Sequence, residues 1–306
     1  MAISAVMVKM LRDKTGAGML DCKSALEETN GNAEEAEKIL RKKGLAAAAK
    51  KAGRVAADGL IGHVVSNGVA ALVELNCETD FVAKTEKFKQ ALHALTNFVH
   101  GHAVLGDTAD GDVAALAAAA PPSKMPHPGA TIAESLQAFT GDLGEKTAVR
   151  RFARLVAGPG SALTIYAHPG DKTVVAIETK GMPEDLGKDL AMHVAALAPQ
   201  FASRDAVAPK ALADEREIAR AKAIAAGKPE AVAEKMVEGM IGKWFGEVVL
   251  VDQAFAKDDS KKVSQVIAER GAKDASVVRF VRYKVGEGVE KKAGGDFAAE
   301  VAALTK

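Results

Sequence analysis

Apolar residues in the first thirty positions recur with the period of an α-helix. Val6, Met10 and Leu11 share one predicted face, and a glycine-rich break follows them. A second helix is predicted over residues 20–28, up to an Asn-Gly pair that favours a turn. The pattern therefore indicates short helices packed against one another rather than strands.

A third helix is predicted directly after these two. Asn32 can cap its first turn, and Gly44 is expected to end it. Three helices of this length make a small bundle that is barely stable on its own. We assign this bundle to residues 1–54.

The period changes from helix to strand after this bundle. Residues 60–65 and 69–75 are β-rich runs joined by an Asn-Gly turn, which is a strong hairpin signal. A helix is predicted over residues 85–100. The Gly/Ala/Pro/His-rich stretch 101–130 is interpreted as a surface excursion or linker.

A similar pattern returns about one hundred residues later. Strand-like runs at 162–167 and 173–177 precede a helix predicted over 183–197, and Glu78 aligns with Glu178 at this offset. Such an internal repeat predicts two similar subdomains packed around a pseudo-twofold axis.

The second copy carries an insertion of two helices. Residues 208–226 and 230–243 are helical in pattern, and the Gly/Pro turn between them predicts an antiparallel pair. The other predicted elements are strands at 247–251 and 277–285, a helix at 263–270 and a final helix at 297–304.

Composition narrows the class of protein. With 48% hydrophobic and 26% charged residues, the chain is neither disordered, collagen-like nor a disulfide scaffold. Its 41 basic and 40 acidic residues give a net charge of +1, which argues against a broad nucleic-acid groove. Two cysteines, no apolar run of membrane-spanning length and no signal-peptide pattern lead us to expect a cytoplasmic protein.

No motif for covalent chemistry stands out. The chain has no phosphate-binding loop. His93 and His100 lie two turns apart on one predicted helix, too far for one zinc ion, so we interpret these histidines and His102 as surface residues. Cys22 and Cys77 have no metal-ligand partner nearby and are interpreted as buried thiols. An enzyme with a nucleotide or metal site in the core is therefore disfavoured.

The segment Thr79-Asp80-Phe81-Val82 has two interpretations. It lies between a predicted strand and the next helix. In the first interpretation Asp80 caps that helix and Phe81 is a core residue, which composition alone favours. In the second, a loop tip presents an apolar wedge beside a carboxylate. Physical argument from the sequence leaves both open.

Long blocks of the sequence resemble the bacterial elongation factor Ts family. The blocks are LRDKTGAGMLDCKSAL at 11–26, AKKAGRVAADG at 49–59 and NCETDFVAK at 76–84, and stretches at 191–195, 227–239 and 279–290 agree with them. They follow the family order and span nearly the whole chain, except for residues 101–130.

The resemblance implies an α+β fold. Its parts would be an N-terminal three-helix module similar to a ubiquitin-associated (UBA) domain, a two-subdomain α/β-sandwich core with an internal repeat, an antiparallel coiled-coil insertion and a C-terminal helix. The expected boundaries are 1–54 for the UBA-like module, 55–140 and 141–287 for the core subdomains, 208–243 for the insertion and 288–306 for the C-terminal module.

The resemblance also implies a guanine-nucleotide exchange factor without covalent chemistry or cofactor. The partner would be elongation factor Tu, bound to GDP or free of nucleotide, with no direct contact to nucleic acid or membrane; homodimerisation through the core is allowed. Thr79, Asp80, Phe81 and Val82 would enter the partner's G domain and displace its Mg²⁺. The implied partner-binding residues are Arg12, Met19, Leu20 and His168. A ubiquitin-like-binding adaptor, the rival suggested by the three-helix module, leaves most of the chain unexplained.

Overall fold

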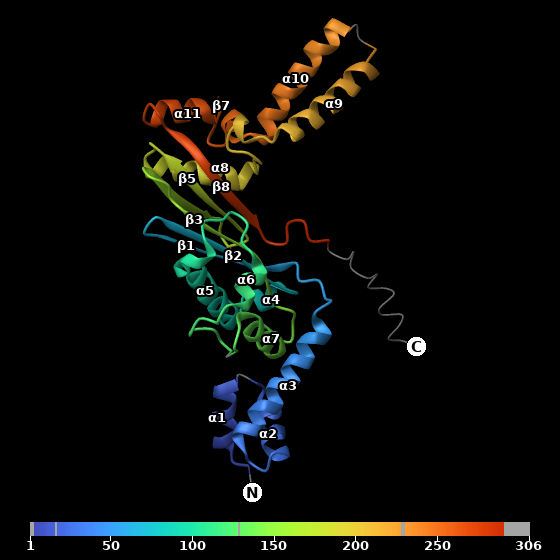
Figure 1. Cartoon of the computed structure of the whole chain (residues 1–306), viewed down its shortest axis with the longest axis vertical. Helices are drawn as coiled ribbons and strands as arrows, with labels where there is room; N and C mark the ends of the chain where they lie inside the picture. Colours follow the sequence, from blue (N-terminus) through green and yellow to red (C-terminus); the bar gives the residue numbers. More distant parts are fainter. Residues whose placement is uncertain (1–2, 16, 128, 228–229, 291–306) are drawn as a thin grey trace.

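The computed structural model describes residues 3–15, 17–127, 129–227 and 230–290. Figure 1 shows a mixed α+β molecule in which two sheets lie in the middle, a three-helix unit at one end and a pair of long helices at the other. The C-terminal helix predicted at 297–304 lies outside the described residues. The predicted division into domains likewise stays a prediction.

The three-helix unit consists of α1 (Ala5–Thr15), α2 (Met19–Glu28) and α3 (Ala33–Lys51). Asn32 caps α3, as predicted, by accepting from the N–H groups of Glu34 and Glu35. The prediction that Gly44 ends this helix is wrong. A Cβ on Gly141 of α7 (Ile132–Leu143) would lie 3.2 Å from Gly44 Cα, so the glycine serves a close helix crossing instead.

The first sheet has the antiparallel order β1-β2-β3. The strands are β1 (Asp58–Ser66), β2 (Val69–Cys77) and β3 (Ala148–Val156), and α5 (Glu86–Gly101) packs on one face. The predicted hairpin is confirmed, with Asn67 and Gly68 at φ 50° and 70° in its turn. The predicted helix after it is also confirmed.

Residues 101–147 hold more structure than the sequence indicated. They contain the 3₁₀ turn η1 (Ala103–Leu105), α6 (Val113–Ala118) and α7, and they lead into β3. The predicted boundary at 140/141 assigns β3 to the second subdomain, whereas its hydrogen bonds are to β2 of the first sheet. Three arginines interrupt the apolar pattern of β3, and the hydrogen-bond acceptors that they contact are distant in sequence.

The second sheet has the order β4-β5-β8. The strands are β4 (Ser161–Ala167), β5 (Thr173–Lys180) and β8 (Ser276–Lys284). Its outer face is covered by α8 (Glu184–Leu197) and α11 (Val263–Arg270), which were both predicted. A short 3₁₀ turn η2 (Arg204–Ala206) follows α8, and β6 (Ala254–Phe255) pairs with β7 (Asp258–Lys262) beside α11.

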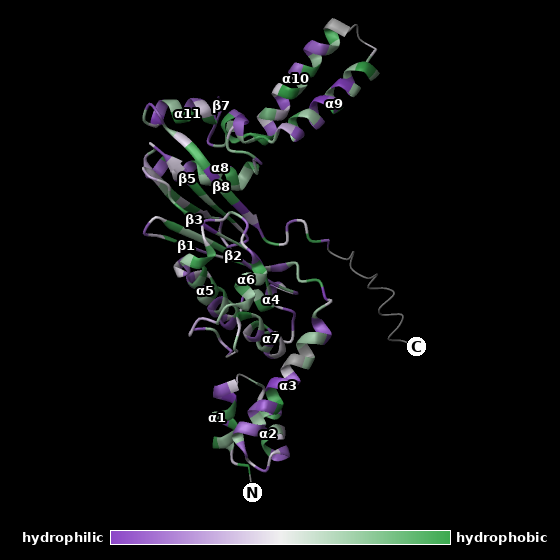
Figure 2. Ribbon diagram, in the orientation of Figure 1, coloured by the Kyte–Doolittle hydropathy of each residue, from purple (hydrophilic) through white to green (hydrophobic). Residues whose placement is uncertain are grey.

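The two sheets pack face to face around an apolar layer. Leu72 and Leu155 of the first sheet are buried in one cluster with Val174 and Val281 of the second. Figure 2 shows hydrophobic colour along the strands of this central region. Helices therefore cover the outer face of each sheet, and the inner faces form a shared core.

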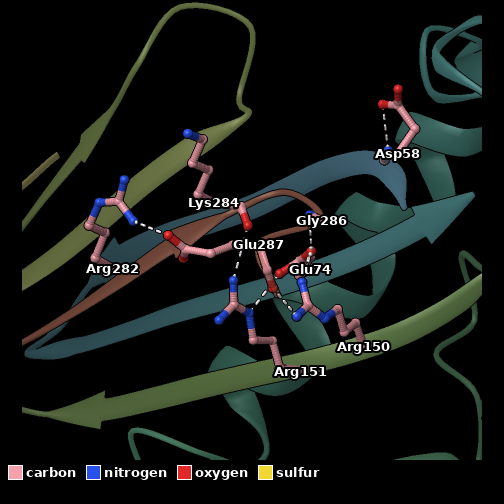
Figure 3. Close-up of polar contacts among 9 residues, drawn as sticks. Asp58, Glu74, Arg150, Arg151, Arg282, Lys284, Gly286 and Glu287 are labelled. Carbon is pink, nitrogen blue, oxygen red and sulfur yellow. Dashed lines mark hydrogen bonds and ion pairs between the residues drawn. The ribbon is translucent and has the colours of Figure 1, made fainter. Parts of the chain in front are cut away.

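Matched buried ion pairs flank this shared core. Glu74 on β2 is fully buried and pairs with Arg151, and Glu178 on β5 is 2% exposed and pairs with Arg279. Each glutamate lies opposite its arginine, next to a bulge in the third strand of its sheet. Figure 3 shows Glu74 between the guanidinium groups of Arg150 and Arg151.

These pairs also tie each sheet to the other. Arg151 donates to the carbonyl of Lys284 at the end of β8, and Arg279 donates to that of Val156 at the end of β3. Glu74 accepts from the N–H of Gly286, and Glu178 accepts from the N–H of Gly158. Each of these glycines lies two residues beyond the third strand of the opposite sheet.

The strand register corrects the alignment of the two halves. Glu178 corresponds by its bulge, its arginine and its glycine partner to Glu74, and not to Glu78 as the offset of about 100 predicted. Side chains of one residue type recur by chance in a short alignment. The hydrogen-bonding partners identify the equivalent position without that ambiguity.

The second half carries the predicted helical pair. α9 (Pro209–Ala225) and α10 (Glu230–Val248) pack through Ala219, Ala223 and Ile241. The strand predicted at 247–251 is wrong, because α10 continues to Val248 and a 3₁₀ turn η3 (Leu250–Asp252) follows. This run is buried at the base of the helical pair, and its valines suit a buried helix end as well as a buried strand.

Candidate functional site

Two threonines shape the chain between β2 and α5. The Thr79 hydroxyl accepts from the N–H of Val82 at 3.4 Å and begins the short helix α4 (Asp80–Ala83). The Thr85 hydroxyl accepts from the N–H of Phe88 at 3.3 Å and begins α5. Threonine is a favoured N-cap, so two caps six residues apart produce a separate helical turn before the long helix.

Phe81 points away from the protein at this turn. Its side chain is 78% exposed, whereas Ala83 is 1% exposed and Val82 packs against the core beneath the sheet. The interpretation of Phe81 as a core residue is therefore wrong. The turn contacts the core through Val82 and Ala83, while its largest side chain, Phe81, lies in solvent. Such exposure is unusual for phenylalanine.

Asp80 is likewise not the cap that one interpretation predicted. Its carboxylate pairs with Lys84 at 2.6 Å, and the Lys84 ammonium lies 6.0 Å from the centre of the Phe81 ring. Hydrogen bonding to Asp80 raises the pKa of Lys84. The tip of the turn thus presents an exposed aromatic ring beside a solvent-facing ion pair.

The base of the turn is held by several hydrogen bonds. The backbone N–H and the hydroxyl of Thr79 donate to the two carboxylate oxygens of Glu145 at 2.9 and 2.6 Å. Glu78 accepts from the N–H of Lys146 at 2.7 Å. The Cys77 thiol lies 3.1 Å from the Thr79 carbonyl, and burial raises its pKa to about 12.

His168 lies in the turn between β4 and β5, which contacts the first half of β1. The Asp171 carbonyl accepts from the N–H of Ile61, and Lys172 pairs with Asp58, whose register partner on β2 is Cys77. His168 itself is exposed, and its Nδ1 lies 3.2 Å from the Tyr166 hydroxyl. The His168 turn therefore contacts β1 of the first sheet, and the neighbouring strand β2 of that sheet leads into the Phe81 turn.

The other predicted partner-binding residues lie on the separate three-helix unit. Arg12 is exposed on α1, and Met19 and Leu20 are 55% and 83% exposed at the start of α2. Val6 and Met10 were predicted to lie on the packed face of α1, but their side chains are 67% and 68% exposed. The buried pair is Val8 and Leu11, three residues apart, and that spacing was the available signal.

The histidines do not form a metal site. Within the described residues, no three His, Cys, Asp or Glu side chains are placed to hold a metal ion. His100 contacts Ser66, and His102 stacks on Phe98 at 4.5 Å between ring centres. The buried His193 accepts from the N–H of Ala256, so its Nε2 carries the proton toward Gln253, and burial lowers its pKa.

Two further observations concern what the described residues can bind. Among its helices, none combines the length and the apolar composition of a membrane span. The exposed side chains among the predicted site residues lie on separate elements. They are one aromatic ring (Phe81), two large apolar side chains (Met19 and Leu20), one guanidinium (Arg12) and one imidazole (His168). Such a set suits contact with a protein surface better than the binding of a small molecule in a cavity.

Comparison with known proteins points in one direction. The model of a family described as "Elongation factor TS" matches residues 78–287. A curated relative named "Elongation factor Ts" from Thioalkalivibrio sulfidiphilus is 45% identical over 308 aligned residues, covering 100% of this chain and 99% of the relative. Relatives of the same name from Syntrophotalea carbinolica and Rhodospirillum centenum are each 44% identical, covering 100% and 99% of this chain and 100% and 98% of their own lengths.

Proposed function

Because this chain belongs to the elongation factor Ts family, we propose that it is a translation elongation factor that binds elongation factor Tu and promotes the exchange of its GDP for GTP. The activity takes place in the cytoplasm and needs no cofactor of its own. Support comes from the family match and from relatives that align over almost their entire lengths.

Each part of the molecule has a role in this proposal. The three-helix unit is a UBA-like module that grips the partner's G domain through Arg12, Met19 and Leu20. The two-sheet core adds a contact at His168. The α9–α10 pair is an antiparallel coiled-coil arm, and residues 288–306 are a further contact module. All of these roles follow the family resemblance.

The exposed Phe81 is the observation that supports the mechanism. Its ring stands 78% exposed on a turn anchored by the buried Ala83 and by the bonds of Thr79. In the proposal, Thr79, Asp80, Phe81 and Val82 enter the partner's G domain, and Phe81 displaces groups that hold Mg²⁺. A wedge that is already ordered loses little conformational freedom on binding, so more of its contact energy is available to disturb that site.

Exchange then follows from linkage rather than from a chemical step. Mg²⁺ bridges the phosphates of GDP to the partner, so a lost ion weakens GDP binding. The exchange factor and GDP lower each other's affinity by the same factor, as any coupling between two ligands requires. GTP in excess completes the exchange, and no covalent bond is made or broken.

A GDP-release assay tests this proposal. Elongation factor Tu loaded with fluorescent GDP is mixed with the protein or with its Phe81→Ala variant, and the release rate is followed over a range of concentrations. The matched control is Val104→Ala, because Val104 is an apolar residue that is 90% exposed on a different element, the 3₁₀ turn η1. Slow release by Phe81→Ala alone supports the proposal; normal release by all three proteins would refute the role of Phe81.

A further inference from the structure

Glu145 is the only side chain in the described chain that bonds both the backbone and the hydroxyl of Thr79. It follows Gly144, the left-handed residue (φ 76°) that ends α7. One carboxylate oxygen accepts from the Thr79 N–H at 2.9 Å, and the other accepts from its hydroxyl at 2.6 Å. Hydrogen bonds to an ionised carboxylate are among the stronger ones in proteins.

At this contact, Thr79 supplies two hydrogen-bond donors and Glu145 supplies two acceptors. The Thr79 hydroxyl donates its proton to Glu145 and accepts from the N–H of Val82, so both of its functions are used. The Thr79 N–H can only donate. Glu145 must therefore supply two acceptors, which an ionised carboxylate does and an amide does not.

This contact sets the direction of the exposed aromatic ring. Thr79 lies two residues before Phe81, and the helix between them is a single turn of four residues. One isolated turn is not stable by itself, so its ends determine its orientation. The far end is anchored by the buried Ala83, and the near end is anchored by Glu145.

We infer that Glu145 is a positioning residue for nucleotide exchange, which holds the Phe81 turn in the direction that productive insertion requires. This inference rests on the proposed function of Phe81. Glu145 is half-buried behind the tip, so it acts through Thr79. Its loss frees the Thr79 N–H and lets the turn adopt other orientations, which slows exchange more than it weakens binding, because the other contact surfaces are unchanged.

A double-mutant cycle with Phe81 tests the inference. GDP release from elongation factor Tu is measured for Glu145→Ala, for Phe81→Ala and for the two combined, together with the affinity of each protein for the partner. We expect Glu145→Ala to slow release about five- to tenfold, since small misplacements of a positioned group are costly. In the Phe81→Ala background, the same change should have no further effect.

Two further variants keep the test informative if Glu145→Ala folds poorly. Glu145→Gln offers one acceptor and should give an intermediate rate. Thr79→Val removes both the hydroxyl bond to Glu145 and the cap of α4, so it should slow release at least as much. The matched control is Glu269→Ala, because Glu269 is an exposed glutamate of the distant helix α11 that pairs with Lys261 of β7. This control should release GDP at the rate of the unmodified protein.

Amide hydrogen exchange at Thr79 gives a readout that needs no partner. Glu145→Ala should lose protection at this amide. Lost protection with normal GDP release would overturn the inference and leave the proposed function standing. Equal slowing in both Phe81 backgrounds would also overturn it, since Glu145 would then act by another route. A Phe81→Ala variant with normal release would remove the proposed function and the inference together.

Discussion

The two sheet-and-helix units of the core differ at the junction between the hairpin and the helix that follows it. Both have a hairpin, a third strand on the same side and a helix on the outer face, and both bury a glutamate paired with an arginine of the third strand. Between the hairpin and the helix, however, the first unit has eight residues, 78–85, and the second has three, 181–183. The turn that carries Phe81 occupies this additional length.

The second junction shows what the shorter connection does. Gly181 takes a left-handed conformation (φ 63°), its carbonyl accepts from the N–H of Ala272, and α8 begins within three residues. No large apolar side chain of that junction is among the exposed ones in the described chain. A candidate functional site thus arises from extra residues at an exposed junction, while the buried ion pairs that join the sheets are kept in both units.

Removing either buried glutamate should have the largest effect. Glu74→Ala leaves Arg150 and Arg151 without their carboxylate. Glu178→Ala leaves Arg279 with the exposed carboxylate of Asp107 and the carbonyl of Val156. Each change should lower the free energy of unfolding by about 2–3 kcal/mol, because partly exposed arginines lose their main acceptor and a glycine N–H loses its partner. Denaturant melts measure this. The control Glu269→Ala should stay within about 0.5 kcal/mol. A large loss in one unit alone would show that the two pairs are not equivalent.

Truncating Phe81 should have the next largest effect, on function and not on folding. Phe81→Ala should slow GDP release from elongation factor Tu about 30-fold, as expected for an aromatic that carries about 2 kcal/mol of an interaction. Its free energy of unfolding should change by less than about 0.5 kcal/mol, because the ring is already in solvent. Phe88→Ala removes a fully buried ring from the nearby helix α5 and should instead cost about 3–5 kcal/mol of stability. A large stability loss in Phe81→Ala would place the ring in the core.

Deleting most of the α9–α10 pair should have a smaller effect on the core. The pair packs on itself through its own apolar cluster, and its base packs through Leu212, Trp244 and Phe245. Replacing residues 213–240 by a short glycine linker retains that base. The thermal transition should remain cooperative, with a change in unfolding free energy of about 1 kcal/mol or less. Calorimetry measures it, and loss of the cooperative transition would show that the second unit depends on its insertion.

Near neutral pH, the smallest effect is expected at Cys77, behind the Phe81 turn. Its pKa is raised to about 12 by burial, against an ordinary value of 9.0. Above pH 9 the unfolded chain therefore loses the thiol proton while the folded chain keeps it, so this group lowers stability as pH rises from 9 toward 12. In a Cys22→Ser background, native Cys77 should resist alkylation at pH 8.5 and react only after unfolding. Rapid alkylation of the native protein would show that the turn opens.

Local pattern was enough to predict much of the secondary structure. The hairpin at Asn67 and Gly68 was predictable because left-handed residues between β-rich runs have few alternatives. The start of the helix capped by Asn32 and both ends of the helix at Val263–Arg270 were predictable because the apolar period agrees with the residues at these ends. The family was recognisable from long blocks, although the roles of individual site residues remain predictions.

The misplaced elements share a physical cause. Gly44 resembled a helix end because glycine weakens helices, yet its missing side chain serves the contact with Gly141. The run at 247–251 resembled a strand because its valines suit any buried site. β3 was overlooked because its arginines look solvent-exposed until Glu74 is placed beside them. In each instance the deciding contact is distant in the sequence.

The sequence by itself determined the helical and strand periods, the turns, the fold class and the family, because these depend on neighbouring residues or on long matching blocks. Only the tertiary structure decided which glutamates are equivalent, which face of α1 is exposed, and that Phe81 stands in solvent while Ala83 is buried. Those properties depend on which side chains compete for a limited interior. That competition is settled by packing across the whole chain, and residue type alone does not record its outcome.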